Sequence, residues 1–478
     1  MKRELASLSE NKVASPVEVT SVPPHTKAIG TRWVFAVKPD GRFKARLVAQ
    51  GYRDHFRLPF GDVSSPVYPG ESQKILLAIA NNFVWHVEQL DFATAYPQAE
   101  LDGEIFVKQP PGFQEMSKET GKSHAWRRAR SLYGLATSAK TWNQTVDQAL
   151  KETGWTATAS DPCLHQKGRG EQYALLVLYV DDCLITSKTK EQLQQIKKEL
   201  KGRFKIKHLG PASNFLGLKI ERSEELGTLS TDQTTYVHDI LERFGMTESK
   251  GVDVPMMRGQ QQERENEPLD ATELKTYQEI VGSLLYLSTH TLFDMAYATW
   301  RLAKRMSGAT KWDLPSAKRV LRYLKGRRDL KITFRRREFA LKAYCDASYC
   351  QPERGQKSVT GNRVMIWSAP VADGTKKQLI TAGNATESDL IALDSCVKQV
   401  LFIMGLLGEL GIQQNSPVPV LCDNAVGCCT AETSRHGSRT KHLVVRLRRI
   451  TDNVNSDHIN MAFVPGNLQR EDCLAKVL

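Results

Sequence analysis

The chain has 478 residues, which is more than one hydrophobic core usually encloses, so a single-core protein is excluded and two or more domains are expected. Hydrophobic residues make up 41% and charged residues 25% of the chain, which excludes a largely disordered protein. The formal net charge of +13 favours a polyanionic partner such as nucleic acid, because lysine and arginine neutralise phosphates.

The nine cysteines are an odd number scattered through apolar runs, without the spacing of a disulfide framework or a zinc site. This usage favours a reducing compartment. No basic segment leads an apolar stretch at the start of the chain, and no uninterrupted apolar run reaches about eighteen residues. We therefore expect a soluble, intracellular protein with no membrane partner.

The N-terminal part of the chain begins with a polar, proline-bearing extension, residues 1–30. A basic hairpin follows, formed by "TRWVFAV" and "FKARLVAQGY" on either side of the turn "KPDGR". The next expected elements are a helix in "ESQKILLAIANNF", strands in "WHVEQLDFATAY" and "EIFVKQPPGF", and a helix in "SAKTWNQTVDQALKETG". In that last helix Trp142, Val146 and Leu150 repeat every four residues, which predicts one buried face.

A buried hairpin is expected in "LLVLYVDDCLI", with Asp181 and Asp182 at its tip. The next stretch, "TKEQLQQIKKELKGRF", predicts an amphipathic helix that buries Leu193, Ile196, Leu200 and Phe204. The polar segment "RGQQQERENEPLDATE" is the expected linker. Helices then resume in "YQEIVGSLLYLSTHTLFDMAYATWRLAKRM" and "SAKRVLRYLKG", and a βαβ-like unit begins at "LKITF".

Two adjacent carboxylates at the tip of a buried hairpin repel each other and raise a pKa unless a cation neutralises them. A third carboxylate, Asp91, also ends an apolar strand where the chain changes direction. Carboxylate oxygens are the ligands of hard divalent ions, and three of them could hold two Mg²⁺ ions for phosphoryl transfer at a 3′-hydroxyl. Two alternatives stay open: neutralisation by lysine or arginine, and an ordinary solvated turn.

A second group of four carboxylates occurs in the C-terminal part of the chain. Asp346 ends a strand in "AYCDASY", Glu387 begins a helix in "ATESDLIAL", Asp423 ends a strand in "VLCDN", and Asp472 lies in "QREDCLAKVL". Together they suit a two-metal hydrolase acting on a phosphodiester. Taken singly, each is an ordinary turn or helix-cap residue.

Both groups resemble the motifs of one family. "LYVDDCLI" resembles motif C of reverse transcriptases, and "QLDFATAYPQAELDGEIFVKQPPGF" resembles motif A in the form used by copia-type LTR retrotransposons. "SLYGLATSAKTW" resembles motif B, "RWVFAVKPDGRFKARLVAQGY" the fingers, and "AKRVLRYLKG" part of the connecting region. The second group resembles the catalytic quartet of ribonuclease H, again in copia form. The resemblance covers nearly the whole chain, with the motifs in the family's order.

The resemblance implies an α+β multidomain chain: a right-hand polymerase with fingers, palm, thumb and connection, followed by an α/β ribonuclease H-like domain. The expected segments are an N-terminal extension over 1–30, fingers and palm over 31–225, a thumb-like segment and linker over 226–275, a helical connection over 276–335, and the ribonuclease H-like domain over 336–478.

The resemblance also implies roles for individual residues. The catalytic and metal-binding set comprises Asp91, Asp181, Asp182, Asp346, Glu387, Asp423 and Asp472. The nucleotide-binding set comprises Lys38, Lys44, Arg46, Tyr96, Gly134 and Ser138, with Tyr96 as a steric gate against a 2′-hydroxyl. The set expected to follow the nucleic-acid backbone comprises Arg435, Arg439, Lys441 and His442. A packed core tyrosine and solvated basic side chains are the alternatives for Tyr96 and for the basic residues.

The implied function is an RNA- and DNA-directed DNA polymerase with ribonuclease H activity, using Mg²⁺ with Mn²⁺ as an alternative. The implied partners are an RNA template, a DNA primer, an RNA–DNA hybrid and dNTPs; the oligomeric state is open. The expected location is intracellular, with the cytoplasm, virus-like particles and the nucleus as alternatives.

Departures from the family occur in two motifs. Ala136, Thr137 and Ala139 replace the lysine, glutamine and proline usual in motif B, which removes polar groups near template and nucleotide. Arg448 or Arg449 stands where the family has a histidine. Two other functions therefore remain open: a nucleic-acid-binding relic without turnover, and an RNA-dependent RNA polymerase, against which Tyr96 argues.

Overall fold

The computed structural model divides the chain into two compact units. Unit 1 comprises Met1–Tyr68 and His86–Pro211, and unit 2 comprises Pro69–Trp85 and Ala212–Leu478. The residues that the structure describes are 1–23, 26–37, 41–53, 63–66, 69–116, 121, 124–257, 267–349, 357–367, 369–424, 443–465 and 472–476. The mixed α+β architecture with several sheets is confirmed.

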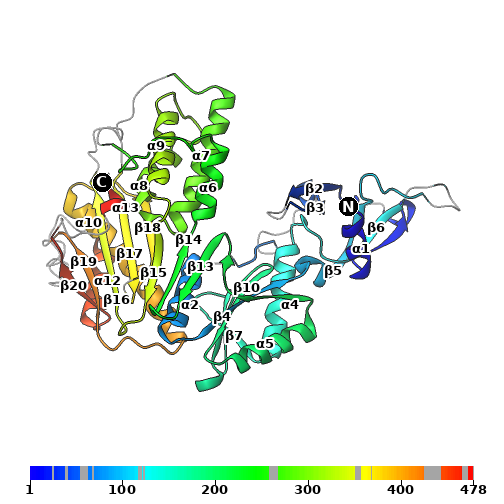
Figure 1. Ribbon diagram of the computed structural model, residues 1–478, viewed down its shortest axis with the longest axis horizontal. Helices are drawn as coiled ribbons and strands as arrows, with labels where there is room; N and C mark the ends of the chain where they lie inside the picture. Colours follow the sequence, from blue (N-terminus) through cyan, green and yellow to red (C-terminus); the bar gives the residue numbers. More distant parts are fainter. Residues whose placement is uncertain are drawn as a thin grey trace. The chain divides into compact units, whose positions relative to one another are not determined.

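Unit 1 is built around a six-stranded sheet in the order β11-β4-β10-β9-β8-β7 (Figure 1). Its strands are β4 (His86–Phe92), β7 (Trp155–Ala157), β8 (Leu164–Lys167), β9 (Ala174–Tyr179), β10 (Asp182–Ser187) and β11 (Ile206–Pro211). The hairpin of β9 and β10 is the one expected from "LLVLYVDDCLI", and β10 also pairs antiparallel with β4.

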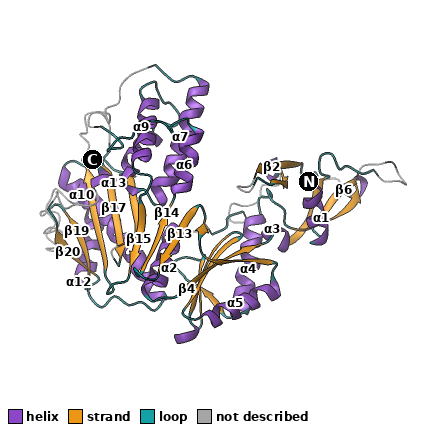
Figure 2. Cartoon of the chain, viewed as in Figure 1, coloured by secondary structure: helices purple, strands orange, loops and turns teal. Residues whose placement is uncertain are grey.

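Two helices, α4 (Ser138–Glu152) and α5 (Lys190–Arg203), cover one face of this sheet (Figure 2). The predicted apolar faces are confirmed: Trp142, Val146 and Leu150 of α4 are buried in one core with Leu193, Ile196 and Leu200 of α5. Thr189 is the N-cap of α5, and its hydroxyl stabilises the start of the helix by accepting a hydrogen bond from the Gln192 N–H. This core therefore supports the sheet that carries Asp91, Asp181 and Asp182.

The N-terminal segment forms a helix and a strand that its polar, proline-bearing composition does not predict. Unit 1 also contains α1 (Lys2–Glu10), β1 (Ala14–Glu18), β2 (Thr31–Val37), β3 (Phe43–Ala49), α3 (Ala95–Gln98), β5 (Glu100–Lys108) and β6 (His124–Arg130). The basic hairpin β2-β3 is confirmed, and β1 pairs with β6 in the sheet β1-β6-β5. The segment 1–30 thus contributes a helix and a strand to unit 1.

Unit 2 contains two further sheets and most of the helices. Its elements are α2 (Gly70–Asn82), β12 (Asn214–Phe215), β13 (Leu218–Ser223), β14 (Thr228–Asp232), α6 (Thr234–Arg243), α7 (Ala271–His290), α8 (Ala296–Ala303), α9 (Asp313–Gly326), β15 (Lys331–Arg335), β16 (Leu341–Ser348), β17 (Val359–Ile366), β18 (Ala369–Lys377), α10 (Ala385–Glu409), β19 (Val418–Cys422), α12 (Val444–Asn455), β20 (Ile459–Phe463) and α13 (Asp472–Ala475). Helices α6 to α9 share one apolar core.

The five-stranded sheet of unit 2 has the order β18-β17-β16-β19-β20. The strands β16, β17 and β18 form an antiparallel meander, whereas β19 and β20 run parallel to β16. Helix α10 connects β18 to β19 and packs on β16 and β17 (Figure 1). Because β16 and β19 are parallel neighbours, their carboxyl ends lie at the same edge of the sheet.

Helix α2 packs on the other sheet of unit 2, β12-β13-β14-β15, although it lies between segments of unit 1 in the sequence. All its residues from Ser72 to Asn81 are buried. The Asn81 side-chain amide donates hydrogen bonds to the carbonyl oxygens of Gly227 and Phe334, at 3.2 and 3.1 Å. These contacts hold α2 to β14 and β15.

Among the described residues one helix, α10, is long and apolar enough to cross a membrane, judged by length and composition alone. Asp394 and Lys398 interrupt its apolar sequence, so the helix contains no uninterrupted apolar run of about eighteen residues. Most of its apolar residues are buried in unit 2, as in the core helix of a folded domain.

Candidate active sites

The structure brings the first three predicted carboxylate residues to one end of adjacent strands. Asp182 begins β10, and its register partners are Tyr179 on β9 and Asp91 on β4. Asp181 lies in the turn between β9 and β10, where its carbonyl oxygen accepts a hydrogen bond of 2.8 Å from the N–H of Phe92. The hairpin tip and the end of β4 are therefore joined directly at the backbone.

Burial and neighbouring carboxylates disfavour the ionised forms of Asp181 and Asp182 at this end of the sheet. Burial raises the pKa of Asp182 to about 6, and the carboxylates of Asp181 and Asp91 raise it as well. Burial also raises the pKa of Asp181, with a further contribution from Asp91, whereas Arg46 and Lys44 lower it. Such a site gains free energy by binding a cation.

One cation is already present. Lys207 on β11 is in register with Asp91, and its Nζ lies 2.9 Å from the Asp91 Oδ2. Within the described ranges no cluster of three or more His, Cys, Asp or Glu side chains is arranged to hold a metal ion. Carboxylate side chains that meet at one end of the sheet are hard oxygen donors of the kind that Mg²⁺ prefers. The expected neutralisation by lysine is observed for Asp91, and the metal site stays a prediction.

Tyr96 lies beside the aspartates, at the start of α3. Its ring contacts that of Tyr133 edge-on, with centroids 5.0 Å apart, and the Arg46 guanidinium lies 5.0 Å from the Tyr133 ring centre. Burial and then the charge of Asp181 raise the pKa of Tyr96. A cavity of about 190 Å³ is lined by Tyr96, Trp142, Tyr179 and Val180, among others. Tyr96 therefore borders a cavity next to the hairpin tip.

The other predicted nucleotide-binding residues differ in their placement. Lys44 and Arg46 lie on β3, close enough to lower the pKa of Asp181, and Lys38 lies outside the described residues. Gly134 has a φ of +86°, and a Cβ atom there would lie 2.2 Å from the carbonyl oxygen of Ala49. This turn needs glycine because it packs directly on β3.

Ser138 is buried, and its contacts are internal to the turn before α4. Its hydroxyl donates to the carbonyl oxygen of Leu132 at 2.6 Å and accepts from the Ser131 hydroxyl at 2.9 Å. These contacts explain a serine at this position without a nucleotide.

A second site lies at the edge of the five-stranded sheet. Cys345 pairs with Cys422 across the parallel strands β16 and β19, so the next residues, Asp346 and Asp423, are neighbours. Asp423 follows the end of β19 as predicted, whereas Asp346 lies two residues before the end of β16 because the pairing with β17 continues to Ser348. Ligands bind at such carboxyl ends in open α/β sheets. The Lys476 Nζ lies 3.0 Å from Asp346 Oδ1 and 3.8 Å from Asp423 Oδ2. As at the first site, a lysine ammonium lies against carboxylates that were predicted to bind a metal.

Asp389 on α10 joins this second site, although the sequence interpretation passed over it. The Asn424 side-chain amide donates to Asp389 Oδ2 at 2.7 Å. The pKa of Asp389 is raised to about 7, mainly by burial and also by the nearby Cys422, Asp346 and Asp423, whereas the hydrogen bond from Asn424 lowers it. The carboxylate of Asp389 therefore shares the electrostatic field of Asp346 and Asp423.

Glu387, the residue predicted for this position, makes a capping contact. Asn384 is the N-cap of α10 and accepts from the Glu387 N–H, while Glu387 Oε2 accepts from the Gly383 N–H at 2.9 Å. A glutamate three residues after an N-cap asparagine is typical of a helix start, so "NATE" also indicates a capping role for Glu387, whose carboxylate here accepts from the residue before the N-cap. Asp389 lies two residues further along α10, on the side of the helix that faces Asp346 of the sheet.

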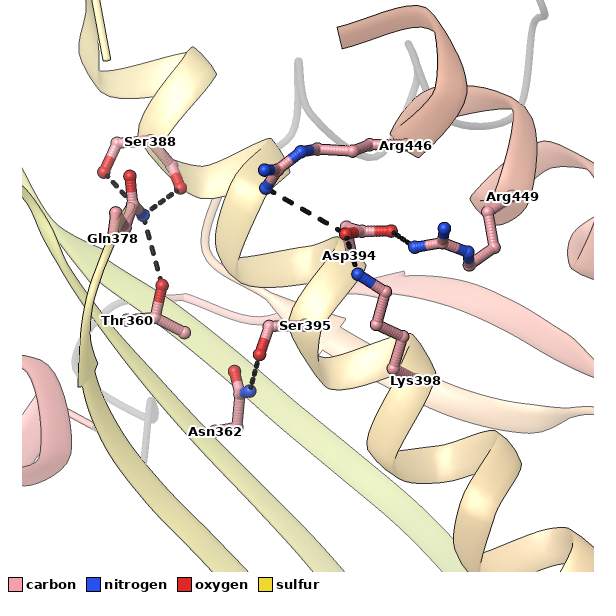
Figure 3. A network of polar contacts seen from close by, with 9 residues as sticks. All are labelled: Thr360, Asn362, Gln378, Ser388, Asp394, Ser395, Lys398, Arg446 and Arg449. Atoms are coloured by element: carbon pink, nitrogen blue, oxygen red, sulfur yellow. Dashed lines mark hydrogen bonds and ion pairs between the residues drawn. The ribbon is translucent and has the colours of Figure 1, made fainter. Parts of the chain in front are cut away.

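Polar contacts hold α10, and with it Asp389, against the sheet and α12 (Figure 3). The Gln378 side-chain amide donates to the Ser388 carbonyl oxygen at 2.8 Å, and that of Asn362 donates to the Ser395 hydroxyl at 3.0 Å. Asp394, 1% exposed, forms ion pairs with Lys398, Arg446 and Arg449. Arg449, one of the two arginines at the family's histidine position, is therefore an anchor between α12 and α10.

The remaining predicted residues are only partly described. Asp472 begins α13, but its side chain lies outside the described residues, as do Arg435, Arg439, Lys441 and His442. The α13 backbone is placed by the Thr375 hydroxyl, which donates to the Leu474 carbonyl oxygen at 2.8 Å. This contact brings the α13 segment to the sheet that carries Asp346.

Comparison with known proteins identifies the class. The profile of the family "Reverse transcriptase (RNA-dependent DNA polymerase)" matches residues 15–258, about half of the chain, and the chain belongs to this family. More narrowly, it is a region of a copia-type retrotransposon Pol polyprotein.

Three relatives are similar over 95% or more of the chain. It is 31% identical to the retrovirus-related Pol polyprotein from transposon TNT 1-94 of Nicotiana tabacum, over 100% of this chain and 36% of that protein. It is also 31% identical to the one from transposon RE1 of Arabidopsis thaliana, over 95% of this chain and 31% of the relative. The transposon Ty1-DR5 Gag-Pol polyprotein of Saccharomyces cerevisiae is 23% identical over 95% of this chain and 26% of its own length. The chain thus spans about a quarter to a third of these curated relatives.

Proposed function

We propose that the chain is an RNA- and DNA-directed DNA polymerase with ribonuclease H activity on RNA–DNA hybrids. The observation that carries the polymerase proposal is the convergence of Asp91, Asp181 and Asp182 at one end of adjacent strands. These residues would hold the divalent ions, which supply activation of the primer 3′-hydroxyl and stabilisation of the leaving pyrophosphate. The right-hand arrangement and the five domain assignments are part of this proposal.

The other residues near the aspartates have distinct proposed tasks. Arg46 and Lys44 contribute positive charge toward Asp181 and toward an incoming triphosphate. The ring of Tyr96 excludes a 2′-hydroxyl, which favours dNTPs over rNTPs. The substrates are accordingly a primed RNA or DNA template and dNTPs, inside the cell.

For the second site we propose a ribonuclease H centre formed by Asp346, Asp423 and Asp389, with Asp472 as a further ligand. Asp389 replaces Glu387 in this set because its carboxylate interacts with those of Asp346 and Asp423. The hybrid made at the first site is the substrate of the second.

Primer extension tests the polymerase proposal. The full chain with a primed RNA template, dNTPs and Mg²⁺ should extend the primer, and Asp181→Asn should reduce the rate more than about 100-fold because a metal ligand is lost. Asp239→Asn, which changes an exposed carboxylate on α6, is the matched control. Extension that survives Asp181→Asn contradicts the proposal, and rNTPs used as well as dNTPs favour the RNA polymerase alternative.

Hybrid cleavage tests the second site. Asp389→Asn should reduce hydrolysis of the RNA strand more than about 100-fold, as Asp346→Asn should, whereas Glu387→Gln should keep most of the rate. If Glu387→Gln abolishes hydrolysis and Asp389→Asn does not, Glu387 is the ligand and Asp389 is not.

A binding protein without turnover is the second candidate. The lysine pairs Lys207–Asp91 and Lys476–Asp346 favour it, since each places an ammonium where a metal would bind. Tight binding of the hybrid with neither extension nor cleavage, at any Mg²⁺ concentration, would support it.

A further inference from the structure

The backbone between β9 and the two aspartates is strained. Val180 has a φ of +54°, in the left-handed region that a β-branched side chain rarely adopts. Asp181 and Asp182 follow it directly. A strained residue persists only where its surroundings hold it, so contacts to this turn decide where the two carboxylates point.

One buried side chain supplies such a contact. The Trp142 Nε1–H on α4 donates a hydrogen bond of 2.6 Å to the carbonyl oxygen of Val180. Trp142 is only 1% exposed. The indole is therefore fixed by the core and in turn holds the strained residue.

The same indole also contacts the strand that carries Asp91. Phe92, the next residue on β4, lies edge-on to Trp142 with ring centroids 5.5 Å apart. Phe204 packs against both rings, 5.7 Å from Trp142 and 5.4 Å from Phe92. Trp142 thus touches the residue before Asp181 and the residue after Asp91.

We propose that Trp142 is a positioning residue that sets the spacing between Asp91 and the Asp181–Asp182 pair for a small divalent ion. The inference rests on the proposed polymerase site. Mg²⁺ requires nearly ideal octahedral geometry, whereas Ca²⁺ accepts irregular geometry. Loss of the indole hydrogen bond therefore weakens Mg²⁺ binding more than Ca²⁺ binding.

The test uses Trp142→Phe, which keeps an aromatic ring but removes the N–H donor. Trp155→Phe is the matched control, because Trp155 lies in the same core, is 2% exposed, and its Nε1 has no hydrogen-bond partner in the part of the chain that the structure describes. Mg²⁺ and Ca²⁺ binding to the full chain are measured by calorimetry in an Asp346→Asn background, which weakens the second site.

Trp142→Phe should raise the Mg²⁺ dissociation constant about 10- to 100-fold, with a smaller rise for Ca²⁺, and Trp155→Phe should change neither. Phe92→Leu, which removes the aromatic contact, should give the same Mg²⁺-selective change, about 2- to 10-fold, and keeps the test decisive if Trp142→Phe does not fold. Equal changes for both metals, the same result for the two tryptophan variants, or no Mg²⁺ binding by the parent chain would overturn the inference.

Primer extension by the unsubstituted chain separates the two proposals. Mg²⁺-selective weakening in Trp142→Phe without any extension by the parent leaves the inference standing and rejects the polymerase. Extension by the parent with identical metal binding in both tryptophan variants rejects the inference alone.

Discussion

Each acidic site contains a lysine whose ammonium lies against a predicted metal ligand: Lys207 at Asp91 and Lys476 at Asp346 and Asp423. An ammonium tethered in this way neutralises the carboxylates, and a divalent ion at either proposed site would have to displace it. At the proposed sites the lysines would therefore raise the Mg²⁺ concentration needed for binding.

Removing Lys476 tests this competition. Lys476→Met should lower the thermal unfolding midpoint without metal, because Asp346 and Asp423 then repel each other, and added Mg²⁺ should restore it. The Mg²⁺ dissociation constant should fall. Lys318→Met, at an exposed position on α9, is the control. Weaker Mg²⁺ binding in Lys476→Met would instead make the lysine an orienting partner.

The pKa of Asp389 makes stability depend on pH. Its folded pKa of about 7 lies above its ordinary value, so the folded protein holds a proton that the unfolded chain releases between about pH 4 and pH 7. Stability is lost as pH rises through this window. Without metal, Asp389→Asn should be more stable than the parent at pH 8, by about 2–4 kcal/mol, with no difference below about pH 4.

Urea unfolding at several pH values measures this difference. Asp452→Asn, on an exposed face of α12, should show no such pH dependence. Saturating Mg²⁺ should reduce the advantage of Asp389→Asn, because the ion stabilises the ionised parent. An unchanged pH profile in Asp389→Asn would contradict the assignment of Asp389 to the second site.

At the scale of elements, the ion pairs of Asp394 join α10 to α12 (Figure 3). Arg449→Met should lower the free energy of unfolding by about 1.5–3 kcal/mol, since a nearly fully buried carboxylate loses a charged hydrogen-bond donor. Lys219→Met, which breaks the exposed pair with Glu221, should have a much smaller effect because water and salt screen that pair. Equal effects in chemical denaturation would show that the pairs of Asp394 do not stabilise the fold.

Local patterns predicted the elements whose stability is local. The helices α4 and α5 follow from apolar residues at helical spacing, and the β9-β10 hairpin follows from apolar runs on both sides of a polar tip. The polar segment that forms β1 gave no such signal, because its pairing partner β6 lies more than a hundred residues away in the sequence.

The same distinction separates the two candidate sites. Asp181 and Asp182 could be placed at a hairpin tip from the local pattern alone, whereas Asp91 joins them through the pairing of β4 with β10, about ninety residues away in the sequence, and was chosen with the help of the family resemblance. The choice between Glu387 and Asp389 depended on where α10 begins and which side faces β16, because a shift of two residues moves a side chain slightly more than halfway around the helix. Lys207, Lys476 and Trp142 act through tertiary contacts that no spacing along the sequence reveals.

At the scale of the whole molecule, α2 belongs to unit 2 although unit 1 precedes and follows it in the sequence. A fragment of residues 212–478 should therefore aggregate or melt at lower temperature than the same fragment with residues 69–85 fused to its N-terminus. The fusion covers the faces of β14, β15 and β18 that α2 contacts.

Scanning calorimetry of both fragments, with a third that carries Leu76→Asp and Ile79→Asp in the fused helix, measures this effect. Leu76 is fully buried and Ile79 almost fully buried, so an aspartate at either position should prevent α2 from packing. The third fragment should therefore behave like the one without α2. Equal melting of all three would show that α2 does not stabilise unit 2.

The position of α2 also has a consequence for protein synthesis. The strands β14, β15 and β18 are translated some 150 to 300 residues after α2, which at ordinary elongation rates is a delay on the order of tens of seconds. Throughout that interval the nascent chain carries an apolar helix whose docking surface does not yet exist. We therefore expect the yield of native protein to depend on ribosome-associated chaperones and on the elongation rate beyond α2.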